Sequence, residues 1–290
     1  MSTTMNATAR RQAFRAILAG DSCVHPASVF DAISGRIAAE IGFETAILGG
    51  SVASQAVLGA PDHIILTLTE LADLVRRITR AGAPPLLVDA DHGFGNALNV
   101  MRTVEELEAA GVAALTIEDT LLPRPYGPDA TALLPLEEGL GKIRAALAAR
   151  SDPSLVVVAR TGALGVTSTA DAIARARAYA QAGADGIFVT GLSDLAQLDA
   201  LRDATGLPLL VGSARAGIGG APVLAAHGAR VALQGHHTFP AAVKAMRDTL
   251  QALRDGVAPK DLPGLPDAAT MKRLQREPHY DAAIRDFLGG

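Results

Sequence analysis

Residues 86–96 read LLVDADHGFGN, an apolar run that ends in two carboxylates and two glycines. A continuous apolar run of this length is typical of a strand that is buried on both faces, as in a parallel sheet. Only 19% of the residues in the chain are charged. Two acids at the tip of a buried strand therefore need an explanation, which the rest of the chain supplies.

Runs of the same kind recur along the chain, each after a helical pattern that closes near a glycine. They span residues 22–25, 45–50, 85–91, 114–119, 155–161, 186–191, 207–212 and 230–235. The segments between them, such as 104–111 and 170–183, have helical apolar spacing and end in a glycine that can form a C-cap. Eight strand–helix units in a chain of this length predict a (β/α)8 TIM barrel. An open, doubly wound sheet is the alternative, because a strand count does not prove closure.

The chain continues beyond the last predicted strand. A helical pattern over 240–256 is followed by a proline-rich break over 258–266 and by two short helical segments. We therefore expect a catalytic barrel over 1–256 and a C-terminal helical extension over 257–290. A tail beyond a barrel can pack on a neighbouring subunit, so we also expect a homo-oligomer.

Composition excludes several classes of partner. The net charge of −4 and the pI near 6.0 argue against nucleic acid and anionic membranes. Aromatic residues make up only 3% of the 290 residues, which leaves few platforms for base stacking. Cys23 is the single cysteine, so no intrachain disulfide can form, as suits a reducing compartment. With no secretory signal and no apolar run long enough to span a bilayer, we expect a cytoplasmic protein.

Acidic residues concentrate where the predicted strands end, which is the catalytic face of a barrel. Asp89 and Asp91 are two apart, so on a strand they would point to the same side and repel each other unless a cation neutralises them. Glu118 ends the next strand and would complete an oxygen-rich cage of the kind that Mg²⁺ prefers. The alternative is that these acids cap helices or pair with Arg160 or Arg102. We favour this structural explanation less for the acids taken together than for any single one of them.

Two glycine-containing stretches carry weaker signals. Residues 93–95 lack the full glycine spacing of a dinucleotide loop. Residues 217–220 follow the seventh predicted strand, where barrels often bind phosphate, but a simple turn explains them equally well. Cys23 has no partner in view and is interpreted as a small buried residue.

Several segments share their residues and their order with a known family: ILGGSVAS (47–54), DADHGFGN (89–96), ALNVMRTV (97–104), IEDTLLP (117–123), EEGLGKIRAAL (137–147) and VART (158–161). Together they resemble the phosphoenolpyruvate mutase/isocitrate lyase superfamily, and in particular its oxaloacetate decarboxylase branch. The resemblance covers nearly the whole chain. It implies a (β/α)8 barrel whose C-terminal helix is exchanged between subunits in a dimer of dimers.

The resemblance also implies residue roles. Asp89 would bind Mg²⁺, or Mn²⁺, directly, and Asp91, Glu118 and Asp62 would hold it through water. The substrate would be a small α-keto dicarboxylate. Its α-keto carboxylate would be held by Ser51 and Arg160, and His236 would contact it.

The activity implied is Mg²⁺-dependent decarboxylation of oxaloacetate, or of a close β-keto acid, to pyruvate and CO₂. One alternative is another enolate-forming enzyme, either a C–C lyase or a phosphonate-processing enzyme. The other alternative is a barrel that binds α-keto acids without turnover. Lyases of the family carry a Lys-(Lys/Arg)-Cys-Gly-His loop after the fourth strand. Residues 121–127 read LLPRPYG, without Cys or His, which disfavours isocitrate-type lyase chemistry.

Two departures from the family pattern bear on the substrate. Gly162 stands where the family usually has Asn or Asp, so a polar side chain near the site is lost. Ser213 lies in the segment after the seventh strand where decarboxylase relatives carry a Tyr. Both departures leave the identity of the β-keto acid open.

Overall fold

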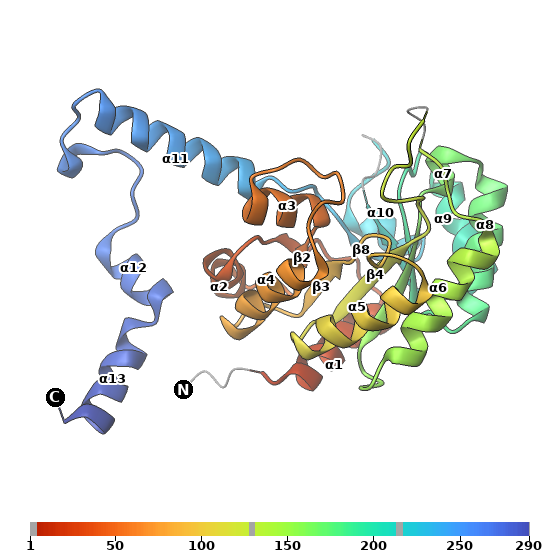
Figure 1. Ribbon diagram of the computed structural model, residues 1–290, viewed down its shortest axis with the longest axis horizontal. Coiled ribbons are helices and arrows are strands. Elements are labelled where there is room, and N and C mark those ends of the chain that lie inside the picture. The colour runs from red at the N-terminus through yellow and green to blue at the C-terminus, as the bar shows by residue number, and fades with distance from the viewer. Residues whose placement is uncertain (1–4, 128–130, 213–216, 290) are drawn as a thin grey trace. The chain divides into compact units, whose positions relative to one another are not determined.

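The computed structural model describes residues 5–127, 131–212 and 217–289 (Figure 1). Eight parallel strands follow one another around a single sheet in the order β1 to β8. Their bounds are β1 Ala27–Ser28, β2 Ala46–Leu48, β3 Leu86–Asp89, β4 Ala114–Glu118, β5 Val156–Thr161, β6 Gly186–Val189, β7 Leu209–Val211 and β8 Ala229–Ala232. The sheet closes through Val24, which forms a parallel bridge with Val231 of β8. The predicted barrel is therefore confirmed.

The first predicted strand is wrong in its position. Residues 22–25 provide only the bridge at Val24, and the strand β1 begins at Ala27. Pro26 lies between them and has no N–H to donate, so the hydrogen-bond ladder is interrupted there. The Val24 N–H donates to the Arg230 carbonyl at 2.9 Å, whereas the Ala27 N–H donates to the Thr45 carbonyl at 3.1 Å. The chain thus pairs first with β8 and then with β2, which closes the barrel.

Helices alternate with the strands. Those of the barrel are α1 Ala7–Ala19, α2 Ala32–Ile41, α3 Gly50–Leu58, α4 Leu68–Arg80, α5 Ala97–Ala109, α6 Leu136–Ala149, α7 Ala163–Val166, α8 Thr169–Gln181, α9 Leu195–Thr205 and α10 Ala221–Ala226. Buried apolar side chains of these helices and of the outward-facing strand positions form one large core.

A second, smaller core fills the inside of the barrel. It is formed by Phe14, Leu18, Ile47, Leu87, Ala113, Ala114, Val156, Val158, Phe188, Leu210 and Val231. Most of these residues are inward-facing strand positions, because side chains alternate between the two faces of a strand. Phe14 and Leu18 come from α1, which packs against one end of the barrel. The opposite end, where the strands finish, is left for polar groups.

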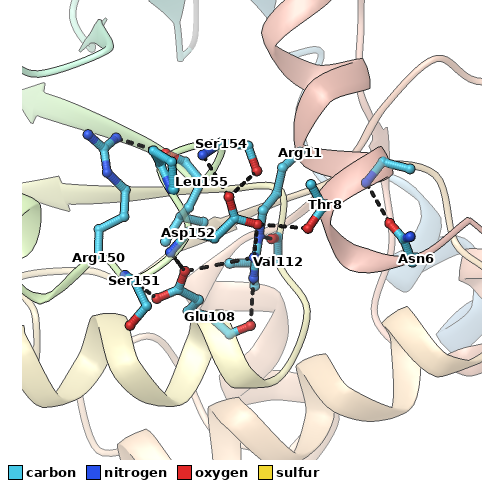
Figure 2. Close-up of polar contacts among 12 residues, drawn as sticks. Asn6, Thr8, Arg11, Glu108, Val112, Arg150, Ser151, Asp152, Ser154 and Leu155 are labelled. Carbon is cyan, nitrogen blue, oxygen red and sulfur yellow. Dashed lines mark hydrogen bonds and ion pairs between the residues drawn. The ribbon is translucent and has the colours of Figure 1, made fainter.

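Polar contacts fasten α1 to the end of the barrel where the strands begin (Figure 2). The Arg11 guanidinium donates to the Val112 carbonyl at 3.1 Å, just before β4, and to the Asp152 carboxylate at 2.7 Å, just before β5. The Asp152 carboxylate also accepts from the Thr8 hydroxyl at 2.9 Å and from the Ser154 hydroxyl at 2.6 Å. These contacts belong to the stability of the fold, because they lie far along the strands from the acids at their carboxyl ends.

The chain divides into two compact units, Met1–His236 and His237–Gly290. The second unit contains α11 Thr238–Arg254, a 3-10 helix Pro259–Asp261, α12 Ala268–Gln275 and α13 Glu277–Leu288. The helix predicted over 240–256 and the two short final helices are thereby confirmed. The domain boundary after residue 256 stays a prediction. In the part of the chain that the structure describes, no helix is both long and apolar enough to cross a membrane.

Candidate active site

Side chains of a strand alternate between its two faces, and at the carboxyl end of the barrel the inward-facing positions carry polar residues. On β4, Thr116 and Glu118 continue the inward series that starts at Ala114, and on β5 Arg160 continues the series of Val156 and Val158. In the strand register, Asp89 is paired with Thr116, and Glu118 with Arg160. These four side chains therefore follow directly on the apolar layers inside the barrel.

The four side chains contact one another. The Thr116 hydroxyl donates to Asp89 Oδ1 at 3.0 Å, and the Arg160 guanidinium donates to Asp89 Oδ2. Arg160 Nε lies 2.9 Å from Glu118 Oε2 in an ion pair. The guanidinium carbon also lies 5.4 Å from the centre of the Phe188 ring, within the range of a cation–π contact. Arg160 is thus fixed between two acids and an aromatic ring.

Asp91 reaches the same place by a different route from the one predicted. The strand β3 ends at Asp89, and Asp91 lies in the following turn with a left-handed φ of 48°. Strand alternation therefore does not explain why both acids face the site. Asp91 is buried, and its carboxylate lies against Gly50, where a Cβ would come within 2.5 Å of Asp91 Oδ1. The missing side chain of Gly50 makes room for this acid.

The surroundings of Asp62, Asp91 and Glu118 make the ionised form of each carboxyl group less favourable than in water. Burial raises the pKa of Glu118 to about 7, although Arg160 opposes the shift. Burial also raises the pKa of Asp91 well above its usual value, and repulsion by Asp89 adds to this. The pKa of Asp62 is raised for the same two reasons. A bound cation would offset this effect, because it favours the charged form of every acid around it.

The acids open into a cavity of about 820 Å³. The charged residues that line it are Asp62, Asp89, Asp91, Glu118, Arg124 and Arg160. Its lining also includes Thr120, Thr131 and Thr190, the apolar residues Leu122, Pro123 and Val166, and the glycines Gly162 and Gly165. The cavity is ample for a small dicarboxylate.

His236 and Ser51 belong to the neighbouring wall and do not line this cavity. His236 lies over Gly49, where a Cβ would come within 2.6 Å of Nε2, and its Nδ1 is 2.8 Å from the Ser28 hydroxyl. Ser51 stands at the start of α3, next to Gly50. His236 therefore lies beside Gly49, and Ser51 follows Gly50 in the chain. Because the Asp91 carboxylate lies against Gly50, this wall adjoins the acids of the cavity. His236 also acts electrostatically on Asp62, in the direction that lowers the pKa of that acid.

The carboxylate oxygens of the four acids in the cavity suit a hard cation that keeps part of its water shell. Among the described residues, no three His, Cys, Asp or Glu side chains are gathered closely enough to hold a metal directly. Asp89 and Glu118 are instead drawn to Arg160. Mg²⁺ is commonly bound through one or two carboxylates and several waters, so a cage of separated acids suits it better than it suits a fully dehydrated ion. The raised pKa values of Asp91 and Glu118 support the same fit.

Asp119, which directly follows Glu118, does not join the acids of the site. Asp119 turns away from the site and accepts hydrogen bonds from Arg175 at 3.1 Å and from the Tyr179 hydroxyl at 2.9 Å. Gly162 leaves open the space beside Thr190, because a Cβ there would lie 3.5 Å from the Thr190 hydroxyl oxygen. Ser213 lies outside the described residues. Cys23 is buried, as predicted.

Sequence reasoning missed three polar residues around the acids. Thr116 orients Asp89, and its signal was available, since it stands two positions before Glu118 on the same inward face. Lys142 of α6 donates to the His92 carbonyl at 2.9 Å, next to Asp91. Ser28 contacts His236. Neither Lys142 nor Ser28 has a sequence signal, because each is brought to the site by tertiary packing.

A barrel with these acids and an arginine at the carboxyl ends of its strands defines the class of protein. Residues 14–254 match the family model described as phosphoenolpyruvate phosphomutase. The chain belongs to the phosphoenolpyruvate mutase/isocitrate lyase superfamily and, within it, to the oxaloacetate decarboxylase family. An oxaloacetate decarboxylase from Bradyrhizobium sp. (strain ORS 278) is 55% identical over 280 residues, which is 97% of each chain.

Solved structures agree with the superfamily and the fold. A phosphonopyruvate hydrolase in complex with oxalate and Mg²⁺ has a TM-score of 0.83 and 30% identity, covering 98% of this chain and 100% of that chain. An oxaloacetate acetylhydrolase in complex with the product oxalate has a TM-score of 0.81 and 31% identity, covering 98% of this chain and 99% of that chain. The similarity extends over the C-terminal helices as well as the barrel.

Proposed function

We propose that the protein is an Mg²⁺-dependent carboxy-lyase that decarboxylates oxaloacetate, or a close β-keto acid, to pyruvate and CO₂. The observation that carries this proposal is the pairing of Arg160 with Asp89 and Glu118 at the mouth of the barrel. It sets a fixed cation beside a cage of acids that suits a metal ion. The relatives named oxaloacetate decarboxylase support the choice of reaction.

In the reaction the C3–C4 bond of the substrate breaks, CO₂ leaves, and the electron pair remains on pyruvate as its enolate, which then takes a proton at C3. Asp89 would hold the metal directly, with Asp91, Glu118 and Asp62 around it. When bound, Mg²⁺ supplies positive charge where negative charge develops on the keto oxygen. Mn²⁺ can supply the same charge with the same oxygen ligands.

The side chains bind and orient the substrate. Arg160 has a planar fork that suits the C1 carboxylate, and the acids beside it raise its pKa and keep it charged. Ser51, in the neighbouring wall at the start of α3, would reach the same carboxylate with its hydroxyl and with the backbone N–H groups of the helix N-terminus when the substrate lies against that wall. His236 orients the substrate from the wall formed with Gly49. No enzyme nucleophile is needed.

The remainder of the cavity suits the departing carboxylate. Thr120, Thr131 and Thr190 offer hydroxyls there, and Leu122 and Val166 offer apolar surface. Arg124 also lines the cavity and adds a cation to it.

The proposal is tested by product analysis. Purified protein is incubated with oxaloacetate and with 3-methyloxaloacetate, in Mg²⁺, in Mn²⁺ or in EDTA, and the products are followed by NMR against metal-only controls. Decarboxylation gives pyruvate or 2-oxobutyrate, whereas C–C hydrolysis gives oxalate. Metal-dependent pyruvate above the controls, lost in Asp89→Ala, is expected. Oxalate as the product, or tight oxalate binding without any turnover, would overturn the proposal.

We also infer that the protein acts in the cytoplasm as a homo-oligomer, a dimer of dimers with exchanged C-terminal helices. Support comes from α11, which has no buried residue and exposes Val243, Met246, Leu250 and Leu253. A groove of about 760 Å³ lies between this helix and residues 263–266 and is mostly apolar. Apolar surface of this kind is usually covered in the assembled protein. Light scattering on the purified protein tests the tetramer.

A further inference from the structure

The turn that carries Asp91 is held at every one of its carbonyls. Residues 90–93 connect β3 to the loop before α5. The four acceptor–donor pairs are Ala90 O with Gly93 N at 2.9 Å, Asp91 O with Glu118 N at 2.9 Å, His92 O with Lys142 Nζ at 2.9 Å and Gly93 O with Thr103 Oγ1 at 3.1 Å. The donors come from the turn itself, from β4, from α6 and from α5. The turn is thus fastened from three neighbouring elements.

These hydrogen bonds hold the backbone of Asp91 in a disfavoured conformation. A left-handed backbone is disfavoured for a residue that has a Cβ, so the φ of 48° at Asp91 persists only if its surroundings impose it. The carboxylate of Asp91 already fills the space left by Gly50. A shift of the turn would therefore move this carboxylate out of the acid cluster.

Lys142 is the unusual donor among the four. It lies on α6 and is buried, among apolar neighbours on the helix such as Leu140 and Ile143. Burial lowers the pKa of Lys142, while Glu138 and Glu118 act in the opposite direction. An apolar side chain would satisfy the packing of this helix face without the cost of burying an ammonium group. The ammonium group donates a hydrogen bond to the His92 carbonyl, which an apolar side chain cannot do.

We propose that Lys142 is a positioning residue for the metal site. By holding the His92 carbonyl, it keeps Asp91 in its left-handed conformation and its carboxylate aimed into the cage. The Thr103 hydroxyl, whose proton is shared with the Asn99 carbonyl at 2.9 Å, adds a weaker hold one residue further on, through the Gly93 carbonyl. The inference rests on the proposed metal site, but it does not depend on which β-keto acid is the substrate.

The test measures metal affinity directly and needs no turnover. Mn²⁺ binding to wild type, Lys142→Met and Lys142→Arg is followed by electron paramagnetic resonance, with thermal unfolding recorded in EDTA. Lys142→Met is expected to bind Mn²⁺ about tenfold or more weakly, as is common when a partner of a metal ligand is lost. Lys142→Arg retains a donor and is expected to recover part of the affinity. Arg144→Met changes an exposed cation on the same helix and serves as the control.

The outcomes separate positioning from simple destabilisation. A lower melting temperature of Lys142→Met in EDTA with unchanged Mn²⁺ affinity would overturn the proposal. If Lys142→Met does not fold, Thr103→Val is used, and it must weaken Mn²⁺ binding in the same direction for the proposal to stand. Wild type that binds Mn²⁺ but does not decarboxylate oxaloacetate would refute the proposed function alone. Wild type that binds no Mn²⁺ would refute the metal site and this inference with it.

Discussion

The Thr116 hydroxyl donates a hydrogen bond of 3.0 Å to Asp89 Oδ1 across neighbouring strands. The other oxygen of the same carboxylate accepts from Arg160. Both oxygens of Asp89 are therefore oriented by side chains of β4 and β5. Its direction is set by the barrel itself, and a metal that binds there meets a ligand already in place.

Replacing Thr116 by Val keeps the shape of the side chain and removes the hydrogen bond to Asp89. We expect Mg²⁺ and Mn²⁺ to bind roughly tenfold more weakly, since partners that orient a metal ligand commonly contribute that much. Thr116→Ser retains the hydroxyl and should bind nearly as well as wild type. Calorimetric titration with Mn²⁺ measures both. Equal affinity in all three proteins would show that Thr116 does not orient Asp89.

A methyl group at residue 50 should damage the site. The Cβ of Gly50→Ala would lie 2.5 Å from Asp91 Oδ1, so the carboxylate must move. Misplacement by about 1 Å in an active site can cost about 10²-fold in rate, and we expect a fall in kcat of that order. Gly141→Ala is the matched control, because nothing lies within 4 Å of its Cβ and alanine is favoured within α6.

The two glycine variants should differ in stability as well as in rate. Gly141→Ala is expected to leave kcat unchanged and to stabilise the fold by up to about 1 kcal/mol. Steady-state kinetics and urea unfolding measure these effects. Wild-type turnover in Gly50→Ala would mean that the position of the Asp91 carboxylate is unimportant for the reaction.

Arg160→Lys should separate charge from geometry. Lysine keeps the positive charge but cannot contact Asp89 and Glu118 together while presenting a planar fork to a carboxylate. We expect kcat/KM for oxaloacetate to fall by about 10²-fold, a loss typical of removing a pre-organised contact. Arg144 lies on the exposed face of α6, so Arg144→Lys should have the same kcat/KM as wild type. Similar kcat/KM values in wild type and Arg160→Lys would contradict the substrate-binding role.

The fold and the central acids could be predicted from the sequence because both follow from simple periodicity. Buried parallel strands read as apolar runs, and inward positions alternate, so Glu118 and Arg160 could be placed at the carboxyl ends of their strands. The first strand was misplaced because the break at Pro26 shifts pairing from one neighbour to the other. Such a shift depends on the closed barrel and leaves no local pattern.

The rest of the site could not be predicted because it depends on tertiary packing. Asp91 faces the site through a left-handed turn, not through strand alternation. Lys142 resembles any cation on an amphipathic helix until α6 is packed against residues 90–93. The implied contacts of Ser51 and His236 came from the family resemblance, and they stay predictions, although the structure brings both residues beside Gly49 and Gly50.

Acid should weaken the attachment of α1 through Asp152 (Figure 2). The side-chain and backbone hydrogen bonds from Ser154, followed by the one from Arg11, hold the pKa of Asp152 well below its usual value. A group with a depressed folded-state pKa stabilises the fold above its unfolded pKa, which is about 3.9 for Asp. This stabilisation is lost as the pH falls through the folded-state value.

Asp152→Asn retains the size of the side chain and removes its titration. The free energy of unfolding should be lower in Asp152→Asn than in wild type at pH 7, by an amount that stays constant down to about pH 5. Below about pH 4 the difference should shrink, because only the wild type then takes up a proton on unfolding at this position. Urea unfolding of both proteins from pH 7 to pH 3 measures the difference. A difference that is constant over the whole range would show that the carboxylate charge of Asp152 does not stabilise the fold.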